Sequence, residues 1–305
     1  MSEFRNFRRA ALSACALSLL ASSGAALARD DSIDRKVAAE PNGEVVISNV
    51  SGTVDVRGWD RNEVQVTGHL GESVERVDVE SSGGRTVVKV VLPHRGSRDG
   101  DAVIEVQVPK NSSVEVSAVS ADVSSRGVLG TQRLNSVSGE ITADISGNES
   151  GARSVSGDVT LRGVGKPASV RVSSVSGSLD ITNFGGKIEV VTVSGDARVQ
   201  VGEANEIRGR TTSGNLELIG KLTRDARVDV EGVSGDLLLR LSAPGGLSAE
   251  IESFSGDIEG CLAKGVERVS KYGPGTRLTL RATGVESGAR IRAKTLSGDV
   301  DICDR

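Results

Sequence analysis

Three carboxylates recur at intervals of 18 residues, at Asp122, Glu140 and Asp158. Each one follows a repeated serine by two residues, so stacking of the repeats would place all three in one column. Like charges in adjacent strands repel, and carboxylate oxygens are the ligands that Ca²⁺ prefers. A weak cation site is therefore one hypothesis for this column. The other is that each acid accepts hydrogen bonds from its own turn while water screens its charge. We predict no other metal site and no cofactor.

The repeated serines could also be compared with hydrolase nucleophiles. The sequence has no Gly-x-Ser-x-Gly elbow, and its Ser-Gly pairs recur too often to mark one catalytic centre. His69 and His94 lack metal-ligand spacing. We therefore predict no catalytic residues and no enzyme activity. A solenoid that cleaves acidic polysaccharide is the alternative, and it would require acids and bases clustered in a groove.

These residues belong to a repeat of about twenty residues, a period typical of solenoids. Numbered from the serine, positions −6, −4, −1, +3 and +5 are mostly apolar. This alternation predicts strands, Ser-Gly-Asp favours a tight turn between them, and we expect all five positions to point inward. One copy gives Val170, Val172, Val175, Leu179 and Ile181, and the serine stands at 51, 120, 138, 156, 176, 194, 213, 234, 255 and 297.

The repeat predicts an all-β chain, a parallel β-solenoid with coils of about 18–21 residues. We assign residues 1–28 to a signal peptide, 29–111 to an N-terminal β region and cap that contains the first repeat, and 112–305 to the solenoid. Ser81-Ser82-Gly83-Gly84 indicates a hairpin in the N-terminal region. Stacking in sequence order places position −5 of successive coils side by side, so Glu189 would lie between Arg171 and Arg208.

The interval of 42 residues between Ser255 and Ser297 is twice the usual one. We expect a degenerate coil there, Gly273–Leu280, with Gly275 in the serine position. Cys261 and Cys303 both occupy position +6 and would then lie two coils apart. That separation, about 9.6 Å at the usual strand spacing, exceeds the ~7 Å that a disulfide allows between Cα atoms. The prediction is two outward-facing thiols with no bond between them.

The first residues resemble an export signal. Arginines within Met1–Arg9 precede an apolar run, and Ala26-Leu27-Ala28 forms a small-x-small cleavage site. Leu12-Ser13-Ala14-Cys15 is a less favoured lipoprotein box, and a short membrane anchor is a second alternative. We expect an exported chain, periplasmic or extracellular at the cell surface, with no transmembrane segment after cleavage.

Composition narrows the classes of partner. The formal net charge is −4, so the electrostatic footprint of a nucleic-acid-binding protein is absent. Aromatic residues make up only 2% of the chain, which disfavours stacking against sugars, bases or flavins. Nucleic acid is therefore excluded from the expected partners.

Several segments together resemble a known family. Asn49–Asp60 reads Asn-Val-Ser-Gly-Thr-Val-Asp-Val-Arg-Gly-Trp-Asp, Val64-Gln65-Val66 follows, and Val106–Pro109 precedes the Val-Ser-Gly-Asp series. This pattern resembles the bacterial putative-adhesin family of β-strand repeats, a domain of unknown function. The resemblance implies a β-solenoid protein of the cell envelope and implies no catalytic residues.

We therefore expect a non-enzymatic exported envelope protein, an adhesin or binding scaffold that presents a β-solenoid surface. Its partner would be an envelope or surface protein, or a polysaccharide. A polysaccharide-active β-helix enzyme and a component of envelope-stress signalling are the alternatives. The repeat singles out no binding residues besides the weak cation candidate.

Overall fold

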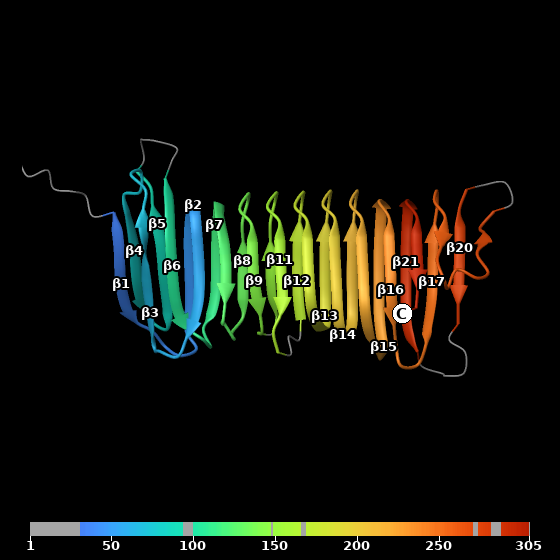
Figure 1. Ribbon diagram of the computed structural model, residues 1–305, viewed down its shortest axis with the longest axis horizontal. Helices are drawn as coiled ribbons and strands as arrows, with labels where there is room; N and C mark the ends of the chain where they lie inside the picture. The colour runs from blue at the N-terminus through green and yellow to red at the C-terminus, as the bar shows by residue number, and fades with distance from the viewer. Residues whose placement is uncertain are drawn as a thin grey trace, which may run out of the picture. The chain divides into compact units, whose positions relative to one another are not determined.

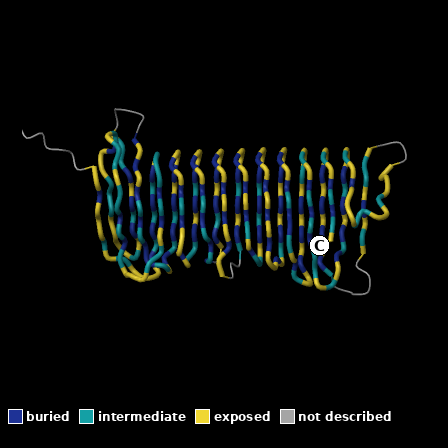
Figure 2. Tube along the Cα trace, in the orientation of Figure 1, coloured by how far each residue is buried: buried dark blue, intermediate teal, exposed yellow. Residues whose placement is uncertain are grey.

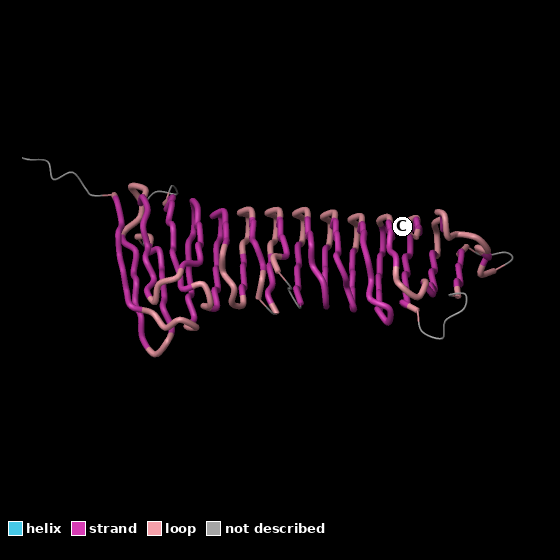
Figure 3. The backbone as a smooth tube through the Cα atoms, turned by 60° about the horizontal axis from the view of Figure 1, so that its bottom comes forward, coloured by secondary structure: helices cyan, strands magenta, loops and turns pink. Residues whose placement is uncertain are grey.

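The computed structural model describes residues 31–93, 100–147, 149–165, 169–270, 274–281 and 288–304. These residues form strands, turns and loops, and none of them is helical (Figures 1 and 3). His94, Gly273 and the predicted signal peptide lie outside the described residues. The prediction of an all-β chain is confirmed for the residues that are described.

The strands follow one another in a single row (Figure 1). Within the described ranges they form one hydrogen-bonded sheet of 22 strands. In chain order these are β1 (Ser32–Ala38), β2 (Glu44–Trp59), β3 (Glu63–Leu70), β4 (Arg76–Ser82), β5 (Arg85–Val91), β6 (Asp101–Pro109), β7 (Ser113–Arg126), β8 (Gln132–Asn135), β9 (Ile141–Ile145), β10 (Ser150–Arg153), β11 (Val159–Gly163), β12 (Ser169–Ser174), β13 (Leu179–Thr192), β14 (Ala197–Thr211), β15 (Leu216–Ser234), β16 (Leu237–Ser242), β17 (Leu247–Ser253), β18 (Ile258–Glu259), β19 (Glu267–Arg268), β20 (Thr276–Leu280), β21 (Ala289–Ser297) and β22 (Val300–Cys303).

Each repeat forms one coil, in which two strand segments flank a Val-Ser-Gly turn. β11 pairs in parallel with β9 on one side and with β13 on the other, so Val159 lies opposite both Ile141 and Leu179. The turns align along the upper edge of the row in Figure 1. The predicted neighbours in the −5 column are also present, since Glu189 pairs with Arg171 and Arg208. The repeat therefore builds a β-solenoid.

The core lies between the two strand segments of each coil, where buried and exposed residues alternate (Figure 2). Val172 at position −4 and Leu179 at position +3 are buried, but Val175 at position −1 is 42% exposed. The expectation that position −1 points inward was wrong. Strand side chains alternate between faces, so after −6 and −4 the next inward position is −2. There Ser174 is buried, and its Oγ accepts a hydrogen bond from the backbone N–H of Gly177 at 2.9 Å.

This assignment predicts opposite outcomes for the same substitution at two nearby valines. Val175→Asp places the charge in water and should change the free energy of unfolding by no more than about 0.5 kcal/mol. Val172→Asp places an unpaired charge in the core and should cost several kcal/mol. Thermal unfolding of the two variants at low protein concentration measures the difference. Equal destabilisation would contradict the outward orientation of position −1.

The glycine at position +1 lets successive turns approach closely. A Cβ atom built on Gly177 would lie 2.1 Å from the carbonyl oxygen of Gly157 in the preceding coil. The same contact recurs at Gly195, where the oxygen is that of Gly177. A larger residue at Gly177 or Gly195 would therefore push two coils apart.

The coils do not stack in sequence order at the C-terminal end. β21 pairs in parallel with β15 on one side and with β17 on the other. β22 likewise lies between β16 and β18. The last coil of the chain is thus inserted between two coils that precede it in the sequence (Figure 1).

The expected degenerate coil is absent, and that prediction was wrong. The described part of the segment, β20, pairs antiparallel with β17, so that Leu278 lies opposite Ile251. β20 also pairs antiparallel with β19. Because β20 follows β17 outward along the row, it covers the C-terminal end of the stack, and Leu278 is buried there.

The charges on β15, β21 and β17 favour this place for the last coil. The outward residues of the three neighbouring strands alternate in sign: Asp229 and Glu231 on β15, Arg292 and Lys294 on β21, and Glu250 and Glu252 on β17. Arg292 lies 3.3 Å from Glu250 and Lys294 lies 3.1 Å from Glu252. Hydrogen bonds from Lys294 and from Arg277 on β20 lower the pKa of Glu252, so its carboxylate is favoured. In sequence order, β15 and β17 would bring four acids together.

The insertion also corrects the prediction for the cysteines. Because β18 and β22 are adjacent, Cys261 and Cys303 lie on neighbouring coils, with their Cα atoms 4.9 Å apart. They form a disulfide. The expected pair of separate thiols depended on a coil between them, and that coil is absent.

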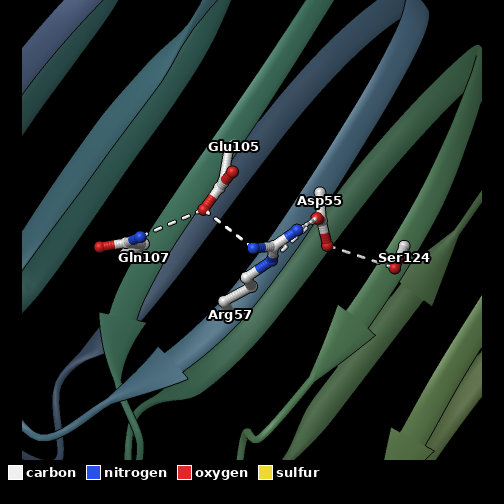
Figure 4. A network of polar contacts seen from close by, with 5 residues as sticks. All are labelled: Asp55, Arg57, Glu105, Gln107 and Ser124. Carbon is white, nitrogen blue, oxygen red and sulfur yellow. Dashed lines mark hydrogen bonds and ion pairs between the residues drawn. The ribbon is translucent and has the colours of Figure 1, made fainter.

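The N-terminal end is built around β2. This strand pairs in parallel with β7 on one side and with β5 and β6 on the other. β3 pairs antiparallel with β6, β1 pairs antiparallel with β3, and β4 and β5 form the predicted hairpin. Polar contacts on the outer face link β6, β2 and β7, and they join Gln107, Glu105, Arg57, Asp55 and Ser124 (Figure 4).

Candidate functional site

The acidic column has a structural role. The Oδ1 atom of Asp122 accepts a hydrogen bond from the backbone N–H of Glu140 at 2.9 Å, and Asp158 Oδ1 accepts one from Ser178 at 2.7 Å. Glu140, with a longer side chain, instead accepts a hydrogen bond from the hydroxyl of Thr142. The column therefore joins consecutive coils. Among the described residues, no group of three or more His, Cys, Asp or Glu side chains is arranged to hold a metal ion.

The same link continues along the stack and across the inserted coil. Asp299 donates its backbone N–H to Asp236 Oδ1 at 3.0 Å, and Asp257 donates to Asp299 Oδ1 at 2.9 Å. Asn215 replaces an acid in this column and accepts from Asp236 at 2.9 Å. An uncharged amide thus performs the same task, which shows that the hydrogen bond does not depend on charge. The other singled-out residue, His69, is exposed on β3 opposite Ser32.

A more specific candidate is an open hollow on the outer face of β8, β10, β12 and β13. Its volume is about 690 Å³. We call it the arginine hollow, after three of the residues that line it, Arg133, Arg153 and Arg171. Lys187 is the fourth cation of its lining.

A missing side chain creates the arginine hollow. Gly151 occupies position −5 of its coil, where β10 pairs with Arg133 on β8 and with Arg171 on β12. The two arginines therefore lie about two strand spacings, or ~9.6 Å, apart across a glycine. In position −3, Arg153 stands between the shorter side chains of Asn135 and Ser173. The floor of the hollow is backbone, and its lining carries four cations and two acids, Glu149 and Glu189.

Two of the four cations form ion pairs, and the other two have no such partner among the residues that the structure describes. Arg171 lies 2.7 Å from Glu189, and Lys187 lies 3.4 Å from Glu206. Arg133 and Arg153 have no ion pair or side-chain hydrogen bond within the described ranges. A guanidinium group presents a planar set of donors that matches carboxylate and phosphate oxygens. The arginine hollow is therefore suited to an anionic group.

A second, smaller hollow of about 390 Å³ lies on the opposite strand segments and is mostly acidic. Asp180 and Glu217 flank Arg198 in position +4, and Arg198 lies 3.5 Å from Glu217. Asp196, at its margin, accepts the backbone N–H of Asn215 at 2.8 Å. We call this the acidic hollow.

Comparison with known proteins places the whole repeat in one family. The sequence profile described as Toastrack DUF4097, a domain of unknown function, matches residues 42–303. The chain belongs to the Toastrack family. No curated protein matches the sequence.

Several solved structures resemble the Toastrack chain at low identity. A putative lipid binding protein from Parabacteroides distasonis is 11% identical, and the match covers 90% of this chain and 98% of that one, with a TM-score of 0.47. A putative adhesin from Bacteroides fragilis is 10% identical, with coverage of 90% and 98% and a TM-score of 0.40. A putative cell adhesion protein from Clostridium sporogenes is 10% identical, with coverage of 90% and 100% and a TM-score of 0.24. No functional residue is assigned from these likenesses.

The Gly-Trp-Asp segment of the Toastrack chain ends β2 and is held there by contacts within the chain. A Cβ on Gly58 would meet the carbonyl oxygen of Gly127 at 2.0 Å. The indole N–H of Trp59 donates to the carbonyl of Glu63 at 2.9 Å, and Asp60 pairs with Lys110. In the described part of the chain, no helix has the length and apolarity needed to cross a membrane.

Sequence reasoning missed the arginine hollow. The signal was present in the −5 column, which reads Arg133, Gly151 and Arg171 over three successive repeats. A glycine between two cations in a strand column indicates a gap that a ligand can enter, since a strand glycine often marks close approach.

Proposed function

We propose that this Toastrack chain is an exported, non-enzymatic binding scaffold of the cell envelope, and that its arginine hollow binds an anionic envelope polymer. The arginine hollow is the single observation that carries the proposal. A polymer bearing regularly spaced carboxylates or phosphates can place one anionic group between Arg133 and Arg153. The adjacent anionic groups of the polymer can replace Glu189 and Glu206 as the partners of Arg171 and Lys187.

The proportions of the site favour a polymer over a small metabolite. The hollow is open, its floor is the backbone around Gly151, and no aromatic residue lines it. Small-molecule pockets are mostly apolar and enclose most of their ligand. A shallow cationic surface gains affinity instead by repeating weak contacts along an extended partner.

The test compares binding of two double variants with that of the unaltered chain. Isolated peptidoglycan and acidic envelope polysaccharide serve as probes, with free product measured in the same samples. Arg133→Gln/Arg153→Gln should weaken binding at least about tenfold, because it removes two charge-assisted contacts. Arg126→Gln/Arg227→Gln removes the same net charge from exposed arginines outside the hollow and should bind as the unaltered chain does.

Two outcomes would overturn the assignment. Equal loss in both double variants would indicate a general charge effect. Saturable binding that neither variant changes would place the ligand elsewhere on the coils.

The acidic hollow keeps a polysaccharide-active enzyme as the second candidate, because it brings two acids beside an arginine. Asp180 and Glu217 lie two coils apart, about 9.6 Å, near the upper limit of carboxylate separation in inverting glycosidases. Soluble oligosaccharide released from the same fractions, and abolished by Asp180→Asn or Glu217→Gln, would favour this candidate over the scaffold. Absence of released product supports the scaffold.

A further inference from the structure

An exposed apolar column follows the turns along nearly the whole stack. It occupies position −1, and its side chains are 38–54% exposed. We call it the apolar edge. Its members, in spatial order, are Val50, Val119, Val137, Val155, Val175, Val193, Val233, Leu296 and Phe254, with Thr212 between Val193 and Val233. In Figure 2 the turns form an exposed row along one edge.

The fold of one chain does not require apolar residues at this position. Every side chain of the apolar edge points to solvent, so the hydrophobic effect contributes little to the stability of a single chain at this position. Strand propensity would explain aromatic and β-branched residues such as Phe254, valine and Thr212, but Leu296 is neither. Other outward positions change sign from coil to coil, as Arg171, Glu189 and Arg208 do. Position −1 thus stays apolar in nearly every coil, whereas the charge at other outward positions varies from coil to coil.

We propose that the apolar edge is the contact surface of a homodimer, in which two copies lie side by side and point in the same direction. The side chains of the edge repeat at the strand spacing of about 4.8 Å. Two edges with this spacing can pack coil against coil along their full length, and a partner without the repeat cannot. A second copy of this chain has the required spacing because its coils are identical.

The area of the apolar edge is sufficient for a dimer. Nine partly exposed apolar side chains present on the order of 600 Å² per copy, as large as the largest apolar patch of a typical monomer. Two facing edges would bury about 1,200 Å², which reaches the lower bound of stable specific interfaces. The serines that follow position −1 in every coil would form an uncharged rim.

Charge selects the direction of the second copy. The acidic column at position +2 runs along one side of the apolar edge, and position −3 runs along the other. An antiparallel pair would set one acidic column against the other, which is repulsive. A parallel pair sets it against position −3, where Asp158 meets Arg153 and Asp299 meets Lys294. Only the coils of Glu231 and Glu252 would bring like charges together.

The first experiment measures the oligomeric state by sedimentation at increasing protein concentration, up to about 100 μM. We expect a reversible dimer. Val137→Thr/Val155→Thr/Val175→Thr keeps β-branching and size but removes apolar surface. It should raise the dissociation constant at least about 100-fold. The matched variant, with isoleucine at the same three positions, should dimerise at least as well as the unaltered chain.

The second experiment tests direction by oxidative cross-linking of Ser138→Cys and Ser297→Cys, each introduced alone. These serines lie near opposite ends of the stack, so each new cysteine meets its own copy only in a parallel dimer. Cys261 and Cys303 stay joined in their disulfide and do not take part in the cross-link. We expect both variants to cross-link, and an antiparallel pair would cross-link neither.

Three results would overturn the proposal. A monomer at every concentration would exclude the dimer, and a threonine variant that dimerises normally would place the interface elsewhere. Binding of the monomer to neutral phosphatidylcholine vesicles, lost in the threonine variant, would assign the apolar edge to a lipid surface.

Discussion

Reduction of the Cys261–Cys303 disulfide lowers the free energy of unfolding by about 4 kcal/mol, the chain-entropy value for a closed loop of this size. The two cysteines are 42 residues apart in sequence. The loop between them contains the end strand β20, so reduction leaves the two ends of this loop joined only by the backbone pairing of β18 with β22. Denaturant unfolding of Cys261→Ser/Cys303→Ser, compared with the oxidised chain, measures this loss.

The reduced unaltered chain serves as the control for the serine variant. Both should unfold at the same denaturant concentration, below that of the oxidised chain. Equal stability of the oxidised and reduced forms would contradict the pairing of adjacent coils by this disulfide. A loss in the serine variant that is absent on reduction would indicate a packing effect of the substitutions.

Gly177→Ala should cost about 3 kcal/mol or more, because the added methyl group overlaps a backbone oxygen and cannot be accommodated by a side-chain rotation. The contact of 2.1 Å with the carbonyl of Gly157 lies far inside normal packing distance. The coils on the two sides of the turn must separate, and their parallel hydrogen bonds lengthen. Calorimetry should show a lower transition temperature, with hydrogen exchange faster at Ser176 and its neighbours.

Ser176→Ala is the matched control for this glycine, since it adds no atoms beside it and lies on the exposed side of the same turn. It should unfold as the unaltered chain does. If Gly177→Ala matched this control, the close approach of successive turns would not be a requirement of the fold.

Strand periodicity could be predicted because burial alternates with a period of two along each coil. Val172 and Leu179 were placed correctly for this reason. Val175 was placed incorrectly because an apolar residue was taken to be a buried one, although the phase from Val172 through Ser174 required the opposite. A buried serine that caps its own turn is difficult to distinguish in sequence from an exposed one.

The order of coils could not be obtained from spacing alone. An interval of twice the repeat length fits a degenerate coil, and the local pattern around Gly275 supported it. The observed order is favoured by the alternation of charge between Glu231, Lys294 and Glu252, which are distant in sequence. Likewise, the arginine hollow required knowing that Gly151 lies between two specific arginines, and only register provides this.

The inserted C-terminal coil means that this chain cannot complete its fold from one end to the other. As the polypeptide emerges, β17 and β18 are made before β21 and β22, yet their final neighbours are the later strands. The edges of β15 and β16 that pair with β21 and β22 must stay unpaired, or lose any earlier partner, until these last strands are made. Most of the solenoid can grow by adding each coil to the one before it. The final step differs, because β21 and β22 must pair with the coil of β15 and β16 and with the coil of β17 and β18 at the same time.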